Sequence, residues 1–333
     1  MKKAIIILAA LASLLACRKD PLAEVKEGSW NHDRQILEIL FCGQAGTAEI
    51  EMDENSGTIS LQILKDSISD LSKIRINSLV LSYKATASCA AGDCLDFSGE
   101  DPHIIVSSPN GEKRDYSVHM EMFEETLKGF YAIKEYWVYG GTGTDYGGSA
   151  IMRPELKSWC WSSAGFGPTA DYDDYLEITL TDILSNGNTT GECFRYGGAN
   201  GRHWDCTLVA TMNKEGDGPV DLHNFYRQIP IGHSRWVRDY AKGTVTFTDD
   251  KGRSTSGQFI PKGQYLVGKK GSTDYIADVT TTDAFHFTLK GVDDWVNIFN
   301  DYDKFVKRPR NFFMDVDRVE AIPEEAKTIG KEN

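Results

Sequence analysis

The sequence lacks the short motifs that mark the commonest catalytic and metal centres. It contains no G-x-S-x-G or H-E-x-x-H pattern, so it offers neither a serine nucleophile elbow nor a zinc-protease pair. It has no C-x-x-C pair, and His203 near Cys206 supplies only two of the ligands that a zinc site needs. The glycine-rich run at 139–149 lacks a Lys-Ser ending, which argues against a phosphate loop.

Clustered basic residues and long apolar runs are also scarce. The chain carries 36 Lys and Arg against 49 Asp and Glu, a formal net charge of −13. Because a nucleic-acid partner requires clusters of Lys and Arg that displace counterions, we expect no nucleic-acid binding. After the N-terminal segment no apolar run reaches 18 residues, so we expect no transmembrane helix.

The N-terminus has the anatomy of a secretory signal. Two lysines at positions 2 and 3 precede an apolar segment over 5–15, which is too short to span a bilayer as a helix. Its end, "LLAC" at 14–17, resembles the lipobox of bacterial lipoproteins. The resemblance implies that the Cys17 thiol carries diacylglycerol and that Cys17 becomes the first residue of the mature protein. Two or more acyl chains anchor a protein stably in a membrane.

The residues around Cys17 bear on where the protein is displayed. We expect a lipoprotein signal over 1–17 and a stalk over 18–30. The "RKDP" at 18–21 partly resembles the short charged signal that sends Bacteroides-type lipoproteins to the outer face of the outer membrane, although Asp20 alone supplies its acidic character. We therefore expect a lipid-anchored outer-membrane protein at the cell surface, with the periplasmic face of that membrane as the alternative. The lipid would be its only membrane contact.

Six cysteines remain after cleavage, an even number that is compatible with disulfides in an exported protein. Cys89 and Cys94 lie on either side of a Gly-Asp turn and could close a small ring. Cys193 and Cys206 flank a glycine-rich loop and could join its base. We predict these two disulfides and leave the other two cysteines as candidate free thiols.

Short alternations of apolar and polar residues dominate the first third of the chain. Residues 47–64 predict a β-hairpin, because apolar residues recur at every second position on both sides of a turn. Residues 103–122 predict a second hairpin with Asn110-Gly111 in its turn. Strands at this spacing without intervening helices favour a β-sandwich over 31–123.

The stretch from Ile36 to Phe123 resembles the small Ig-like domain at the N-terminus of many Bacteroides-type surface lipoproteins. The similar segments are "ILEILFCGQAGTAEIEMDENSGTISLQI" at 36–63 and "PNGEKRDYSVHMEM" at 109–122. In that family a hairpin with an x-I-D-x-x-x-G-T-I pattern and a final strand with N-G-x-x-x-x-Y-x-V frame the sandwich. The resemblance covers about a quarter of the chain. It implies that this domain is a spacer that lifts a functional domain off the membrane. A ring between Cys89 and Cys94 would depart from the family's pattern.

The composition changes after a short linker at 124–129. Six of the seven tryptophans lie beyond residue 130, together with most of the tyrosines and glycines. About eight to ten strands with glycine-rich loops favour a larger β-sandwich of jelly-roll type over 130–322. A charged tail over 323–333 should be disordered. The expected strands include 132–139, 175–181, 205–211, 243–259, 284–289 and 311–319.

Aromatic residues in the loops of this second domain favour carbohydrate binding. Sugars present apolar C–H faces that stack on aromatic rings, and hydroxyl groups that pair with acidic, amide and guanidinium groups. Indoles at 159 and 161 would share one face of a strand, and the loop at 195–206 gathers charged and aromatic residues. The alternative is that these tryptophans form the core. The predicted glycan-binding residues are Trp159, Trp161, Trp204, Tyr146, Asp145, Arg202 and Asp205.

Acidic residues are numerous, which limits what can be concluded from them. Clusters at 171–174, 293–294 and 301–303 are candidate calcium ligands, although solvated turns are the preferred interpretation and none has the EF-hand spacing. We expect no cofactor and keep structural calcium open. A glycosidase needs two carboxylates that face each other across a cleft, and the sequence singles out no such pair, so no catalytic residue and no catalytic metal is predicted.

The sequence therefore predicts an all-β protein, an N-terminal Ig-like β-sandwich followed by a larger jelly-roll-like β-sandwich. We expect it to bind an oligosaccharide or polysaccharide at the cell envelope without turnover, with other outer-membrane glycan-uptake proteins as candidate partners. Two alternatives stay open. One is a glycan-active hydrolase or lyase with a jelly-roll domain, and the other is a structural or pilus-like subunit.

Overall fold

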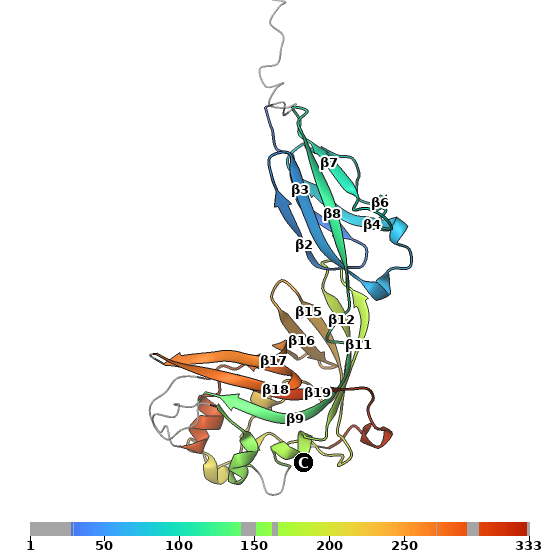
Figure 1. Ribbon diagram of the computed structural model, residues 1–333. Helices are drawn as coiled ribbons and strands as arrows, with labels where there is room; N and C mark the ends of the chain where they lie inside the picture. The colour runs from blue at the N-terminus through green and yellow to red at the C-terminus, as the bar shows by residue number, and fades with distance from the viewer. Residues whose placement is uncertain are drawn as a thin grey trace, which may run out of the picture. The chain divides into compact units, whose positions relative to one another are not determined.

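The computed structural model describes residues 28, 30–140, 151–161, 166–270, 272–291 and 300–331. This part of the chain is built mostly from β-strands (Figure 1). Two compact units divide the chain, Met1–Phe123 and Glu124–Asn333. No helix in the described ranges is both long and apolar enough to cross a membrane. The predicted lipidation site Cys17 and the predicted glycan ligands Asp145 and Tyr146 lie outside the described residues.

The first unit has two sheets around one core. The larger sheet has the order β2-β3-β8-β7-β5 and the smaller has the order β1-β4-β6. Side chains from both sheets form a single buried cluster, so the unit is a β-sandwich, and its Ig-like topology stays a prediction. The strands are β1 (Ile36–Phe41), β2 (Gln44–Met52), β3 (Ser56–Leu64), β4 (Ile74–Leu81), β5 (Thr86–Ala87), β6 (Cys94–Leu95), β7 (His103–Ser107) and β8 (Lys113–Phe123).

Both predicted hairpins of this unit are confirmed. β2 pairs antiparallel with β3, and β7 pairs antiparallel with β8. Ile59, Leu61 and Ile63 on β3 are buried at every second position, as the alternation in the sequence predicts. The two hairpins join into one sheet where β3 runs parallel to β8, a pairing between segments that are far apart in the chain.

The second unit is one sheet that closes on itself. Eight strands pair antiparallel in chain order, and the last of them, β19, returns to pair along β9. The short strand β10 pairs antiparallel with the C-terminal end of β9, where Ile151 lies opposite Tyr139. These strands are β9 (Gly129–Tyr139), β10 (Ile151–Met152), β11 (Tyr175–Ile183), β12 (Thr189–Tyr196), β15 (Gly232–Asp239), β16 (Thr244–Asp249), β17 (Ser254–Lys270), β18 (Thr273–Thr288) and β19 (Asn311–Val319).

This closed, up-and-down order corrects the predicted jelly roll. A jelly roll has two packed sheets with connections between them, whereas here each strand pairs with its neighbours in the chain. Both architectures give the same alternation of apolar and polar residues along each strand, so the local pattern cannot distinguish them. The distinction depends on the pairing of β19 with β9, which no local pattern encodes.

Aromatic side chains fill the interior of the closed sheet. An eight-stranded barrel is just wide enough for side chains to fill it, and large rings suit that volume. The rings of Trp161 and Trp204 meet edge to face with centroids 4.9 Å apart, and Trp204 stacks on Tyr226 at 5.0 Å. Trp161 is 4% exposed and Trp204 is 0% exposed. Both therefore belong to the core, and the prediction that they form a glycan-binding surface is wrong.

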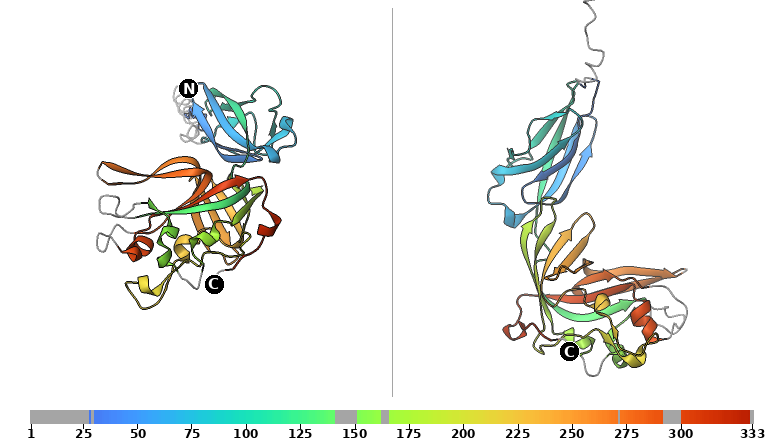
Figure 2. Two further views of the ribbon diagram at one scale, coloured as in Figure 1. Left: turned by 60° about the horizontal axis from the view of Figure 1, so that its bottom comes forward. Right: turned by 180° about the vertical axis from the view of Figure 1, so that it is seen from behind.

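β17 and β18 form a long hairpin that extends beyond the closed sheet (Figures 1 and 2). Two register shifts along the hairpin mark bulges, and bulges bend strands. The far part of the hairpin packs against the outer face of the sheet, where Ala277, Val279 and Phe313 form a second, smaller buried cluster with Trp137 beside it. β19 is therefore covered on both of its faces.

Short elements lie along the lower side of this unit in Figure 1. Residues 323–331 also pack there, which corrects the expectation of a disordered tail for that part of the segment. The amide of Gly197 donates to Thr328 O at 2.7 Å, and that of His203 to Lys331 O at 2.9 Å. The short elements of this unit include η4 (Pro154–Cys160), η5 (Pro168–Asp171), β13 (Thr207–Leu208), η6 (Ala210–Met212), β14 (Val220–Asp221), α3 (His223–Tyr226), η7 (Asp303–Lys307) and η8 (Glu324–Ala326).

The predicted Cys89–Cys94 disulfide is not formed. Both residues are thiols, one half-buried and the other exposed. The turn between them is closed by a hydrogen bond, in which the amide of Ala90 donates to Asp93 Oδ2 at 2.8 Å. The turn is thus held by a side-chain hydrogen bond and not by the covalent ring that the cysteine spacing predicted.

The predicted Cys193–Cys206 disulfide is not formed either. Cys193 is a buried thiol, and burial raises its pKa to about 12. It lies on β12 opposite Ser234 and points into the core. Cys206 directly precedes β13, and its Sγ donates a hydrogen bond to Trp204 O at 3.7 Å. A disulfide needs two Cβ atoms that face each other, and spacing along the chain does not fix those directions.

Candidate functional site

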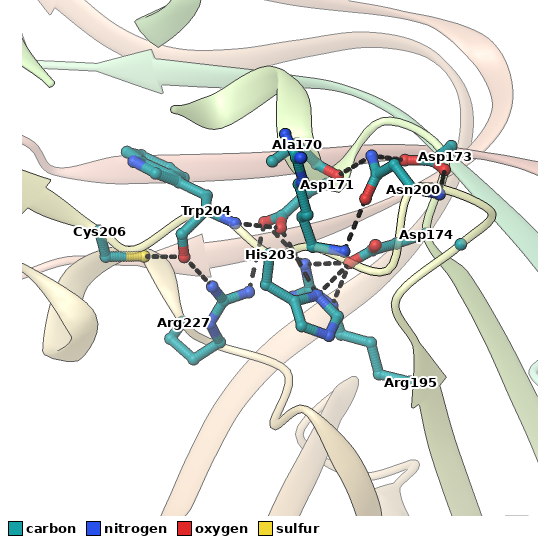
Figure 3. A network of polar contacts seen from close by, with 12 residues as sticks. Ala170, Asp171, Asp173, Asp174, Arg195, Asn200, His203, Trp204, Cys206 and Arg227 are labelled. Atoms are coloured by element: carbon teal, nitrogen blue, oxygen red, sulfur yellow. Dashed lines mark hydrogen bonds and ion pairs between the residues drawn. The ribbon is translucent and has the colours of Figure 1, made fainter. Parts of the chain in front are cut away.

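A network of charged side chains is buried inside the second unit (Figure 3). Arg195 Nη2 lies 2.7 Å from Asp171 Oδ2 and 2.8 Å from Asp174 Oδ2, and all three side chains are at most 1% exposed. Arg227 Nη1 lies 3.3 Å from Asp171 Oδ2. Burial alone would raise the pKa of Asp171, but the two guanidinium groups outweigh it and hold that pKa below its ordinary range. Charges removed from water are tolerated only when paired, as they are here.

His203 joins this network to the C-terminal segment. Its Nδ1 lies 2.8 Å from Asp174 Oδ2, and its Nε2 lies 2.7 Å from the carbonyl oxygen of Ile329. A carbonyl oxygen can only accept a hydrogen bond, so Nε2 of His203 carries a hydrogen. The contact between Nδ1 and Asp174 needs a second hydrogen, which lies on either the ring or the carboxyl group. Burial raises the pKa of Asp174 to about 6, and hydrogen bonds to carboxylates outweigh burial and raise the pKa of His203. The two residues therefore share one proton.

The same cluster has a geometry that could hold a metal ion. Single ligand atoms of Asp171, Asp174 and His203 lie within 4.8 Å of one another. However, Arg195 and Arg227 already place two positive charges against the two carboxylates. Calcium prefers roughly six to eight oxygen ligands, and here it would meet one imidazole and two guanidinium groups. We interpret the network as structural, because it ties β12 to the C-terminal segment.

A groove of about 440 Å³ lies on the outer face of the closed sheet, beside the far part of the β17–β18 hairpin. A second hollow of about 490 Å³ shares Trp137, Ile151 and Arg153 with it, so the two hollows adjoin, and together they are called the groove. The first hollow is lined by Glu135, Trp137, Ile151, Arg153, Ile276, Ala277, Asp278, Val279, Thr280, Phe313 and Asp315. The second adds Met152, Leu156, Lys157 and Lys304.

The register of β9 and β19 places two pairs of side chains in the first hollow. Glu135 lies directly opposite Asp315, and Trp137 lies directly opposite Phe313. Residues two apart on a strand share a face, so these four side chains form one block. The Cβ atoms of directly opposed residues are about 4.5–5.5 Å apart, which brings the two carboxyl groups close together.

A bulge in β9 turns two of these side chains outward. The register shifts by one residue, Lys134, between Ile133 and Glu135. Before the bulge, odd-numbered residues such as Ile133 point into the core, and after it even-numbered residues such as Tyr136 do so. Without the extra residue, Glu135 would face the apolar interior. Bulges often re-aim side chains beside functional sites.

Arg153 organises one side of the first hollow. Its guanidinium forms an ion pair with Glu135 and lies 4.5 Å from the centre of the Trp137 ring. Its Nε lies 4.0 Å from Glu155 Oε1. A cation over an indole is attracted by the ring's π electrons, so Arg153 fixes both neighbours.

Asp315 has no such partner. Its side chain is buried, with the residue 1% exposed, and neither carboxyl oxygen accepts a hydrogen bond within the described residues. Burial raises the pKa of Asp315 to about 7; the nearby charge of Glu135 adds to this effect, and Arg153 opposes it. The indole N–H of Trp137 is close enough to lower this pKa slightly, but it too lacks a hydrogen bond of ordinary geometry in the described part of the chain.

An unpartnered carboxyl group in a buried strand calls for an explanation. Leaving a buried polar group unsatisfied costs about 1–3 kcal/mol, and native proteins contain few such groups. Groups of this kind with shifted pKa values concentrate at functional sites. A ligand that carries hydroxyl groups could donate to Asp315 and Glu135 and accept from Arg153, while its apolar surface meets Trp137. The arrangement is therefore suited to an amphipathic, hydroxylated ligand.

Of the three tryptophans predicted to bind glycans, Trp159 is the one at the surface. It is 52% exposed, its Nε1 donates to Asp301 Oδ2 at 2.9 Å, and Lys157 Nζ lies 4.9 Å from its ring centre. Because Lys157 also lines the second hollow, Trp159 lies beside that hollow. Asp301, one of the candidate calcium ligands, is paired with Lys157 Nζ at 3.4 Å. The candidate ligands at 293–294 lie outside the described residues.

The other predicted loop residues do not line the groove. The Arg202 guanidinium lies 4.7 Å from the ring centre of Phe166. Asp205 is buried, and its Oδ1 accepts from the amide of Thr207 at 3.0 Å. Asp205 thus shapes the loop from within, which corrects its prediction as a glycan ligand.

The groove could not be predicted from the sequence, because its residues come from opposite ends of the second unit. Glu135 and Asp315 meet only when β19 pairs with β9. One signal was available: the run "NFFMDV" at 311–316 is apolar apart from Asn311 and Asp315. A single carboxylate inside a strand of that kind is unusual enough to mark a candidate site.

Comparisons with known proteins assign no family to the chain. No family model matches it, and no curated protein matches it. Among solved structures, a "putative glycoside hydrolase" from Bacteroides thetaiotaomicron aligns over 87% of this chain and 98% of that chain, with 11% identity and a TM-score of 0.24. A likeness of this size supports no conclusion about fold or function.

The unpartnered carboxyl group of Asp315 makes stability depend on pH. Its pKa is about 7 in the folded protein against an ordinary value of 3.8, so the folded state holds an extra proton between these values. The protonated carboxyl group stabilises the folded state fully below about pH 3.8, and this stabilisation is lost as the pH rises through about 7. Asp315→Asn should therefore raise the free energy of unfolding by about 1–3 kcal/mol near pH 8 and change it much less near pH 4, as measured by urea unfolding.

A matched control is Asp283→Asn, a half-buried carboxyl group of β18 outside the groove whose pKa burial also raises. This change should have a smaller effect, because Asp283 is more accessible to water. A loss of stability near pH 8 in Asp315→Asn, or an equal effect at both pH values, would contradict the assignment.

Proposed function

We propose that the second unit binds carbohydrate in the groove that contains Trp137, Arg153 and Asp315. The observation that carries this proposal is the buried carboxyl group of Asp315, whose oxygens accept no hydrogen bond within the described residues. Sugar hydroxyls supply the missing donors. The C–H faces of a sugar ring pack on aromatic side chains, which the same hollow provides.

The size of the groove favours an oligosaccharide over a single sugar. Each hollow, at about 440 and 490 Å³, falls in the range of small-molecule pockets, which is roughly 300–1,000 Å³. Joined through Trp137 and Arg153, the two hollows offer places for successive sugar units. Arg153 and Lys157 supply donors along the way, and Leu156 adds apolar surface.

We also propose that the protein is held in the outer membrane by lipid on Cys17, with the glycan-binding unit displayed at the cell surface. The support is the "LLAC" sequence at 14–17 and the charged residues that follow it. A surface anchor and a carbohydrate groove are consistent with a role in glycan capture beside other outer-membrane glycan-uptake proteins.

Trp137→Ala should weaken carbohydrate binding by at least about tenfold, because loss of the ring removes apolar contact worth roughly 1.5–3 kcal/mol. The measurement is a glycan array probed with the full chain in detergent, followed by calorimetry with each glycan that binds. Trp159→Ala is the matched control, since it removes an exposed indole that lines neither hollow.

The opposite ranking, with binding lost in Trp159→Ala and kept in Trp137→Ala, would place the site elsewhere. Absence of any bound glycan on the array would refute the proposed function. Circular dichroism of both variants establishes that a loss of binding is not a loss of fold.

Cys17→Ser should abolish lipid attachment, because the thioether requires the sulfur of that residue. The measurement is metabolic labelling of whole cells with a palmitate analogue, followed by detection of the label on the purified protein. Wild type should incorporate the label and the variant should not. Equal labelling of the two proteins would rule out Cys17 as the anchor.

A further inference from the structure

The two carboxyl groups of the groove differ in their surroundings. Glu135 is ion-paired with Arg153, whereas Asp315 is buried and accepts no hydrogen bond within the described residues. Glycoside hydrolysis uses two carboxyl groups whose environments hold them in different protonation states. We infer that the groove hydrolyses a glycosidic bond, with Asp315 as general acid and Glu135 as nucleophile, an inference that rests on the proposed carbohydrate binding.

The placement of the pair fits this chemistry. Glu135 and Asp315 are directly opposed on neighbouring strands and line the same hollow. Directly opposed Cβ atoms are about 4.5–5.5 Å apart. In retaining glycosidases the two carboxyl groups are about 5–5.5 Å apart, whereas inverting enzymes need about 6.5–9.5 Å to admit a water molecule. With Glu135 as nucleophile, the inferred reaction is the retaining one.

The protonation of the pair fits as well. Burial, together with the nearby charge of Glu135, raises the pKa of Asp315 to about 7, so about half of the molecules carry its proton at neutral pH. Glu135 is ion-paired with Arg153. The groove therefore holds a proton donor beside a second carboxyl group that is held in place by a guanidinium.

The reaction balances with water as the sole co-reactant. The proton of Asp315 moves to the glycosidic oxygen while a carboxylate oxygen of Glu135 attacks the anomeric carbon. The bond from that carbon to the glycosidic oxygen breaks, an ester forms, and the leaving sugar departs as an alcohol. Asp315, now a carboxylate, removes a proton from water, whose oxygen attacks the anomeric carbon and releases Glu135. Asp315 regains its proton, and the product keeps the anomeric configuration.

Neighbouring side chains favour a sugar over a peptide as substrate. A pair of carboxyl groups can also activate water against a peptide bond. In this groove, however, Trp137 and Phe313 lie two residues from the carboxyl pair on the same face of the sheet. A sugar ring placed at the carboxyl groups would bring the next ring onto Trp137, the aromatic side chain of this pair that is not fully buried.

The experiment incubates the full chain in detergent with each array glycan that it binds and with a panel of 4-nitrophenyl glycosides. Products are followed by mass spectrometry and by release of 4-nitrophenol. Wild type should cleave at least one bound glycan, with a rate that falls as the pH rises through about 7, because Asp315 then loses its proton. Proton NMR of the first product formed should show retained anomeric configuration.

Variants assign the roles. Asp315→Asn and Glu135→Gln should each lower the rate by about 10²–10⁴-fold while the bound glycan is still detected by calorimetry. Asp283→Asn, a carboxyl group outside the groove with a raised pKa, should stay within about threefold of wild type. Azide should restore turnover to Glu135→Ala by taking the place of the carboxylate, which a merely structural residue would not allow.

Failure of this inference is distinguishable from failure of the proposed function. Glycans that bind to wild type but are never cleaved would overturn hydrolysis and leave carbohydrate binding intact. Cleavage that persists in Asp315→Asn, or inverted product, would overturn the assigned roles. Cleavage of casein without cleavage of any glycoside would overturn the substrate class. No bound glycan at all would overturn both.

Discussion

The pairing of β19 with β9 is the interaction on which the second unit depends. It joins the last strand of the sheet to the first, so that each of the eight strands pairs with two neighbours over part of its length. The same pairing sets Asp315 opposite Glu135 and Phe313 opposite Trp137. Closure of the sheet and composition of the groove thus follow from one register. A slip by one residue would turn these side chains of one strand toward the interior, so selection for a closed core also preserves the groove.

Burial of β19 on both faces explains why Asp315 stands out. Residues 311–316 are all buried, the inner ones by the aromatic interior and the outer ones near the β17–β18 hairpin. The buried network elsewhere in the unit makes the contrast plain. Asp171 and Asp174 are as inaccessible as Asp315, yet Arg195 bonds to both of them. Partnered carboxylates hold the structure together, whereas an unpartnered one lowers stability and is retained where a ligand uses it.

Local features of the chain could be predicted and long-range ones could not. The hairpins at 47–64 and 103–122 follow from alternation and turn residues, the strand at 311–319 follows from a short apolar run, and the structure contains all three. The closed sheet required knowing that 311–319 pairs with 130–139. The tryptophans were ambiguous because a large ring suits both a core and a sugar platform, and Trp161 and Trp204 are buried in the core of the second unit. The groove depends on that distant pairing and on a one-residue bulge, and neither leaves a local signature apart from the isolated acid in "NFFMDV".

The central claim is that Asp315 is a buried, unpartnered carboxyl group in a ligand groove. Carbon-13 NMR of aspartate-labelled protein tests it most directly, with the Asp315 carboxyl resonance assigned by its loss in Asp315→Asn. A titration from about pH 3 to 10 should give that resonance a midpoint near 7, and addition of a bound glycan should move the midpoint by changing the hydrogen bonds of the carboxyl group. A midpoint close to the ordinary aspartate value of 3.8 would contradict the account, because it would mean that Asp315 is solvated or already paired.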